Sequence, residues 1–213
     1  MLVLPHTSIV NRVVPKNSFD KFINTKQKKL FSEYVDKIKW ANKLSTQTVK
    51  LEGKDIKEIQ IFEILLKKKH TAEDVLNIID RFIPYHIIFV LRIDSELMYS
   101  VAQKHPNPNS EDNSVIDWRF TSNWINDGAD GFKLNLKKSL DDVFFDFCLQ
   151  VSGKIENQNK SLQKIIGREQ KRKQFLIDIS KLESEIKSCK QFNLKVELNL
   201  KLNQKQQELN KNR

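Results

Sequence analysis

The stretch His86-Ile-Ile-Phe-Val-Leu-Arg-Ile93 decides the predicted fold of this 213-residue chain. Six of its eight residues are apolar. A short, continuous apolar run of this kind is typical of a strand that has neighbours on both sides, and it is too apolar for an edge strand. We therefore expect residues 86–93 to form the central strand of a sheet, with His86 as a hydrogen-bonded core histidine.

Segments on both sides of this strand indicate further strands. Residues 59–66 form a second apolar run, and β-branched residues favour a strand over residues 45–52. The two are expected to pair as a hairpin across the turn at Gly53. Three more strands are expected after the central one, over residues 97–103, 117–125 and 132–136.

Apolar residues spaced three and four apart predict three helices in the same region. The first runs from about Ser18 to Trp40. The second begins at Thr71 and the third at Ser139, each with an aspartate three residues later, which is a capping-box pattern. The predicted body, residues 1–153, is thus an α+β domain: a mostly antiparallel sheet of about five or six strands with helices on one side.

Residues 154–213 differ from the body in charge and in composition. They hold fifteen Lys and Arg against seven Asp and Glu, so they carry +8 of the chain's net charge of +10. They contain no proline, and Gly167 is their single glycine. A long, basic helical tail is the expected structure, and such a tail is typical of a contact with a partner helix or with nucleic acid.

A heptad pattern in the tail predicts a long C-terminal coiled-coil helix, because apolar side chains recur at its a and d positions. Asn193 is the one polar interruption. Residues 192–202 also alternate with period two, so an inter-chain strand stays open, although the absence of turn residues favours a helix. The seam supplies the candidate partner-binding residues, which are Phe175, Ile179, Leu182, Ile186, Cys189, Val196 and Leu200.

The densest basic group precedes this seam and supplies the candidate nucleic-acid-binding residues, which are Lys164, Arg168, Lys171, Arg172 and Lys173. Such side chains bind phosphates without reading bases. The chain has thirty lysines against seven arginines, an excess that an AT-rich genome also produces. A functional origin and a compositional origin of the charge both remain open at this point.

No pattern of catalytic residues stands out. The four histidines lack the spacing of a ligand set, and no glycine-rich nucleotide-binding loop is present. The acid-x-lysine triplets Glu52-Gly-Lys54 and Asp55-Ile-Lys57 occur about as often as chance allows, although they are what a metal-dependent nuclease would use. We therefore expect no catalytic residue, no metal and no cofactor.

The sequence also predicts the compartment. No apolar run approaches the roughly 18 residues that cross a membrane. The N-terminus has no signal-peptide pattern, and Cys148 and Cys189 lie too far apart for a redox motif. A cytoplasmic protein without membrane contact is expected.

Several short stretches, taken in order, resemble a bacterial family known only as a domain of unknown function, numbered four-three-nine-one. The resemblance spans the chain and implies neither an activity nor a site residue. Genes of that family resemble genes that lie beside helicase and DNA methyltransferase genes in restriction-like loci. This resemblance implies that the tail contacts another subunit. The stretches are Leu4-Pro5, Val14-Pro15-Lys16, Ile38–Leu44, Ile83–Phe89, Phe120–Trp124 and Lys190–Asn199.

These observations together predict a non-catalytic accessory subunit. Its tail is expected to pair with itself or with a larger DNA-acting enzyme, such as a helicase or a restriction-modification component, and to contact nucleic acid. Two alternatives remain: a divergent metal-dependent nuclease, and a homodimeric scaffold that binds no nucleic acid.

Overall fold

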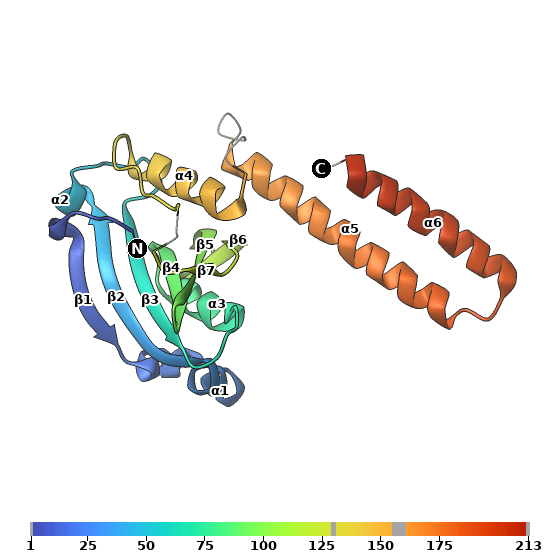
Figure 1. Ribbon diagram of the computed structural model, residues 1–213, viewed down its shortest axis with the longest axis horizontal. Coiled ribbons are helices and arrows are strands. Elements are labelled where there is room, and N and C mark those ends of the chain that lie inside the picture. Colours follow the sequence, from blue (N-terminus) through green and yellow to red (C-terminus); the bar gives the residue numbers. More distant parts are fainter. Residues whose placement is uncertain (1, 129–130, 155–160, 212–213) are drawn as a thin grey trace. The chain divides into compact units, whose positions relative to one another are not determined.

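A computed structural model describes residues 2–128, 131–154 and 161–211 of the chain (Figure 1). The chain divides into two compact units, Met1–Gln158 and Asn159–Arg213. The boundary expected after residue 153 adjoins residues 155–160, which lie outside the described part. The first unit is called the body, and the second is called the hairpin.

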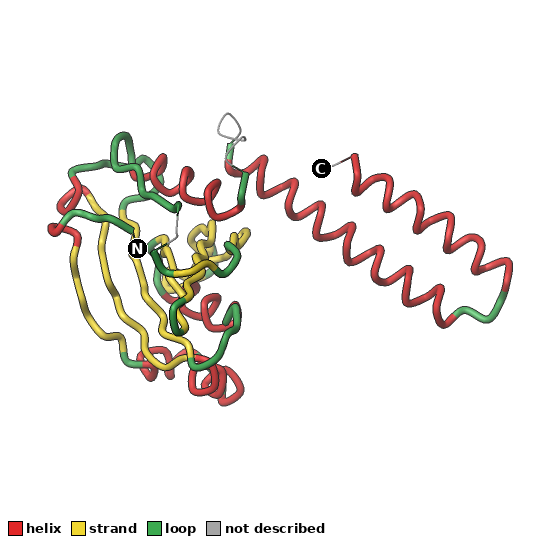
Figure 2. Tube along the Cα trace, in the orientation of Figure 1, coloured by secondary structure: helices red, strands yellow, loops and turns green. Residues whose placement is uncertain are grey.

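The described part of the body contains a seven-stranded sheet with helices packed against it (Figure 2). The strands are β1 (Ile9–Val14), β2 (Val35–Ser45), β3 (Glu58–Leu66), β4 (His86–Ile93), β5 (Glu96–Asn107), β6 (Ser110–Thr121) and β7 (Ile125–Asn126). The helices are η1 (His6–Ser8), η2 (Lys16–Phe22), α1 (Thr25–Tyr34), α2 (Thr46–Val49), α3 (Glu73–Phe82) and α4 (Leu140–Ser152).

The central strand is confirmed, but the sheet is mixed. Strands β1 to β6 lie in chain order, so β4 has β3 on one side and β5 on the other, while β7 pairs with β5. Strand β4 runs parallel to β3, with His86 opposite Ile59, because α3 carries the chain back to the starting end of β3. The expectation of a mostly antiparallel sheet is corrected accordingly.

The helices cover both faces of the sheet, which corrects the prediction that they lie on one side. Successive strand residues point to opposite faces. On β5, Lys104 reaches Asp80 of α3, whereas Tyr99 packs edge-on against Phe147 of α4. Both faces of the central strands are therefore buried, and this explains why β4 is a continuous apolar run instead of an alternating one.

The helix predicted over residues 18–40 is too long. Helix α1 ends at Tyr34, and β2 begins at the next residue. Strand β2 pairs with β1 on one side and with β3 on the other, which buries Val35 and Leu44. Val35 and Ile38 keep a helical spacing of three, but a register irregularity between Val35 and Lys37 lets both reach the core from a strand, and pairing on two sides stabilises that strand.

Two further strand predictions are wrong for related reasons. Residues 46–49 form the single turn α2, so the partner of β3 is β2 and the expected hairpin across Gly53 does not form. Residues 132–136 are irregular.

The predicted helix starts are partly correct. Ser139 caps α4 by accepting a hydrogen bond from Asp142 N at 3.1 Å, but α3 begins after Ala72, whose N–H donates to His70 Nδ1 at 2.8 Å.

The hairpin consists of α5 (Leu162–Ser188) and α6 (Phe192–Lys211), which pack along each other (Figure 1). The helix favoured for residues 192–202 is confirmed. The single continuous helix is corrected: the chain leaves helical geometry at Cys189 and doubles back. No helix in the described ranges is long and apolar enough to cross a membrane.

Candidate functional site: the C-terminal hairpin

The two helices of the hairpin bury a common apolar interface. Ile179 on α5 and Leu198 on α6 are buried side chains of this interface. The ring of Phe175 lies 5.2 Å below Lys205 Nζ, which also forms an ion pair with Glu208 at 2.8 Å. The remaining half-buried members of this interface are Leu182, Ile186, Leu202 and Leu209. Burial of this interface holds the two helices together, since such helices gain little stability alone.

Because the chain doubles back at residues 189–191, the seven residues of the predicted seam fall into a buried set and an exposed set. Phe175, Ile179, Leu182, Ile186 and Cys189 are at least partly buried, as the a/d pattern predicts. Val196 and Leu200 are exposed, because α6 turns Leu198, Leu202 and Leu209 toward α5 instead. The prediction of one seam running through all seven residues is therefore wrong for the last two.

The turn between α5 and α6 contains no glycine or proline, so its cause lies in other local contacts. At the end of α5, the Ser188 hydroxyl donates to Ser184 O at 3.2 Å, and Cys189 Sγ donates to Gln191 O at 3.4 Å. Such local side-chain bonds compete with helix continuation. The amide of Lys195 then donates to Gln191 O at 3.0 Å, which starts α6. Packing of one helix on the other compensates for the lost turn.

An apolar stripe remains on the side of α6 that faces away from α5. Phe192, Val196 and Leu200 follow each other at intervals of four residues, so they lie on one side of the helix. Their exposed fractions are 79%, 45% and 59%. At about 100° per residue, Leu198 and Leu202 point to the other side. The three exposed residues are called the outer stripe.

The candidate nucleic-acid residues all lie on α5, and all five side chains are exposed. At about 100° per residue, Lys164, Arg168, Lys171 and Arg172 fall within one sector of roughly a third of the helix surface. Lys173 points elsewhere. The structure thus brings four of the five residues to one side of the helix, which is the arrangement a single phosphate backbone requires.

The body contains a buried ionic cluster that no sequence pattern indicated. Asp80 of α3 pairs with Lys104 of β5 at 3.0 Å and with Arg119 of β6. Lys104 Nζ also donates to the carbonyls of Asp80 and Ile83, at 2.8 and 2.6 Å. Burial is the largest influence on Lys104 and lowers its pKa, against the opposing effect of Asp80. Every donor of the ammonium is used, so the cluster anchors the end of α3 to the sheet.

His86 is largely buried and forms a hydrogen bond with the backbone of Lys104, as expected of a core histidine, but one of its ring nitrogens lacks a partner within the part of the chain that the structure describes. Its Nε2 is buried without a hydrogen-bond partner in the described residues, and its ring meets Phe144 of α4 edge-on at 4.5 Å between centroids. Burial, and then the nearby positive charge of Lys104, lower the pKa of His86 to about 4. The imidazole is therefore neutral at pH 7.

The acids considered for a nuclease sit at a loop that has an evident structural role. The Asp141 carboxylate of α4 accepts hydrogen bonds from the backbone N–H groups of Lys54, Asp55 and Ile56 at 2.6, 3.0 and 3.0 Å. Burial alone would raise the pKa of Asp141, but these donors lower it. Within the described ranges, no three His, Cys, Asp or Glu residues gather as a metal site would require.

A family of known sequences matches almost the whole chain. The model of a family described as Domain of unknown function (DUF4391) matches residues 2–209, which includes both the body and the hairpin. No curated protein and no solved structure matches the chain significantly.

Proposed function

This chain belongs to that family of unknown function, and we propose that it is a non-catalytic accessory subunit that binds a partner protein through its C-terminal hairpin. The partner is a larger enzyme that acts on DNA, such as a helicase or a restriction-modification component, or a second copy of the chain. The basic side of α5 adds a contact with nucleic acid.

The outer stripe is the observation that carries this proposal. Large apolar side chains at spacing i, i+4 and i+8 form the pattern by which one helix binds a hydrophobic groove or another helix. Burying Phe192, Val196 and Leu200 in a partner would contribute on the order of 1.5–3 kcal/mol for each side chain if fully buried. The inner face of α6 is already occupied by α5, so the stripe is not needed to hold the hairpin together.

The charge of the tail favours an acidic partner surface around the stripe. Residues 154–213 carry a net +8, whereas the rest of the chain carries +2. Complementary charge raises the rate of association and selects between partners more than it raises affinity. A partner enzyme bound to DNA would offer an apolar surface to the outer stripe on α6. Its DNA would place phosphates within reach of the basic side of α5.

The test replaces the outer stripe. In the double variant Phe192→Asp/Leu200→Asp, two charges would have to be buried at the partner interface, so binding should be lost while the hairpin stays helical. A matched control, Asn193→Asp/Gln204→Asp, adds the same two charges at exposed polar positions of the same helix.

Two measurements read the result. Light scattering over micromolar concentrations measures self-association, and pairwise titration with purified helicase and DNA methyltransferase subunits from the same cell measures the hetero-complex. Circular dichroism checks that each variant is folded. A strict monomer that binds none of these enzymes would contradict the proposal, as would a stripe variant that associates as well as its control.

The nucleic-acid contact has its own measurement. If three of the basic side chains engage phosphates, the logarithm of the binding constant should fall against log salt with a slope of roughly −2 to −3. Fluorescence anisotropy with a duplex and a single strand measures this slope. Charge reversal at Arg168, Lys171 and Arg172 should flatten it. Binding that ignores salt would refute the role of α5.

A further inference from the structure

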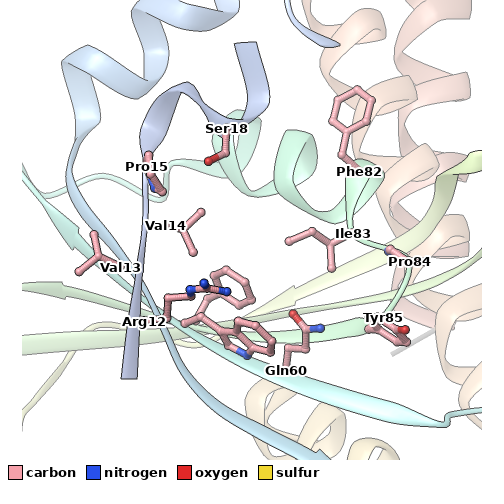
Figure 3. Close-up of a pocket in the computed structure, with 12 residues that line it drawn as sticks. Arg12, Val13, Val14, Pro15, Ser18, Gln60, Phe82, Ile83, Pro84 and Tyr85 are labelled. Carbon is pink, nitrogen blue, oxygen red and sulfur yellow. The ribbon is translucent and has the colours of Figure 1, made fainter. Parts of the chain in front are cut away.

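An open pocket of about 590 Å³ lies in the body, and all of its described lining residues belong to the body. Figure 3 shows it between β1 and η2 on one side and the turn from α3 to β4 on the other. The buried ionic cluster fixes this turn, because Lys104 holds the carbonyl of Ile83. The volume is in the range of small-molecule sites, which are mostly apolar with a few polar groups of fixed orientation.

Strand register builds the aromatic part of the pocket. Arg12 of β1 lies opposite Trp40 of β2, and Trp40 lies opposite Phe62 of β3. Residues that are opposite each other on neighbouring strands share a face of the sheet. The rings of Trp40 and Phe62 are parallel within 9°, with centroids 6.4 Å apart. Tyr85, in the turn after α3, also lines the pocket and is exposed at 43%, so it offers a flat ligand a further aromatic side chain.

Gln60 supplies a polar group of fixed orientation. It is only 5% exposed, and its Nε2 donates to Glu58 Oε1 at 2.8 Å. Glu58 is itself paired with Lys43 at 2.6 Å, so it is a carboxylate that can only accept. The amide nitrogen must therefore face Glu58, which leaves the amide oxygen and the second N–H of Gln60 for a ligand. One donor beside one acceptor matches the edge of a nucleobase.

Arg12 supplies a positive charge at the mouth of the pocket. A backbone irregularity precedes it: Asn11 has a left-handed conformation with φ of 53°, and the register with β2 shifts between Ile9 and Arg12. No hydrogen bond or ion pair joins its guanidinium to another described residue. None of the described lining residues is acidic. Figure 3 shows the guanidinium of Arg12 and the amide of Gln60 directed toward the same space.

We propose that this pocket binds a nucleobase together with its phosphate. The base lies against Trp40 and Tyr85 and pairs with the amide of Gln60, and the phosphate pairs with the guanidinium of Arg12. Arginine suits this role because its planar fork binds phosphate through two parallel hydrogen bonds. A free mononucleotide and the unpaired end of a nucleic-acid strand offer the same chemistry, and the experiment separates these two sources.

The test is calorimetric titration of the full chain with the 5′-mononucleotides, with the corresponding nucleosides and with a short single strand. We expect at least one mononucleotide to bind about tenfold more tightly than its nucleoside. Arg12→Gln should remove this tenfold preference, and Gln60→Leu should remove the discrimination between bases. Arg81→Gln is the matched control, because Arg81 is an exposed arginine on α3 that does not line the pocket.

Each outcome decides the proposal. A preference for mononucleotides that is lost in Arg12→Gln but kept in Arg81→Gln supports a nucleotide site, and the same pattern with the single strand alone assigns the source to a strand end. Equal affinity for nucleosides and nucleotides refutes the phosphate contact. An absence of binding by every probe up to millimolar concentration, with circular dichroism showing a folded protein, refutes the site.

Discussion

Replacement of Lys104 by methionine should strongly destabilise the body. Methionine has a similar length and no donor. The change leaves Asp80 Oδ1, Asp80 O and Ile83 O without the ammonium that now lies 3.0, 2.8 and 2.6 Å away. The side chains of Lys104 and Asp80 are exposed by only 1% and 0%, so water cannot replace the lost donor without opening the core.

The magnitude follows from the chemistry of buried pairs. Removal of one partner from a buried ion pair costs about 3–5 kcal/mol, because the remaining charge stays buried without compensation. Arg119 still neutralises Asp80, which places the expected loss toward the lower end of that range. For a chain of this size, each kcal/mol lowers the melting temperature by about 2–4 °C, so a fall of at least roughly 6 °C is expected.

Tryptophan fluorescence during urea unfolding measures this loss selectively, because all three tryptophans lie in the body. Lys28→Met is the matched control. Lys28 pairs with Asp20 at 3.1 Å, but both side chains are more than 40% exposed, so its loss should cost under about 1 kcal/mol. If Lys104→Met costs no more than this control, the cluster does not anchor α3 and our argument is refuted.

Three further predictions concern other parts of the chain. The folded body lowers the pKa of His86 to about 4 from the ordinary 6.5, so as the pH falls the unfolded chain takes up the proton before the folded chain does. The contribution of His86 to the stability of the body should therefore be complete above pH 6.5. It should fall by up to about 3 kcal/mol as the pH drops toward 4. Urea midpoints measured against pH test this, and His86→Phe should flatten the slope; an identical slope in both proteins would refute it. In the hairpin, Leu198→Ala should lower the helical signal and cost about 2 kcal/mol, whereas Leu200→Ala should stay within about 0.5 kcal/mol; equal losses would mean that the inner and outer faces are misassigned. Ser139→Ala should cost about 1 kcal/mol in thermal melts, since it removes the cap of α4, and an unchanged melting temperature would contradict that role.

Local patterns predicted some elements correctly because their signal is contained within the segment. The apolar run 86–93 is typical of a strand with neighbours on both sides, and it is the centre of the sheet. Ser139 with Asp142 marks the start of α4, since a cap needs only residues three apart. The helical nature of residues 192–202 followed from the absence of turn residues.

No single segment shows which strand or helix it pairs with, or in which direction the paired elements run. Val35 and Ile38 have the spacing of a helix, and a strand forms instead because β1 and β3 pair with β2 on both sides and its register shifts between Val35 and Lys37. The turn at residues 189–191 has no glycine or proline, so the sequence there does not reveal that the helix ends. A continuous helix would use Val196 and Leu200 in its seam, whereas the hairpin packs α6 on α5 through Leu198.

The candidate sites show the same division. The sequence by itself determined that this chain has an α+β body and a basic helical tail, because composition and periodicity act over a few consecutive residues. Only the tertiary structure decided which apolar residues of the tail stay exposed and which side chains meet in the pocket. Arg12, Trp40, Gln60 and Tyr85 come from four separate segments. Their proximity depends on strand register and on the burial of Lys104, and these are contacts between distant residues that no local pattern encodes.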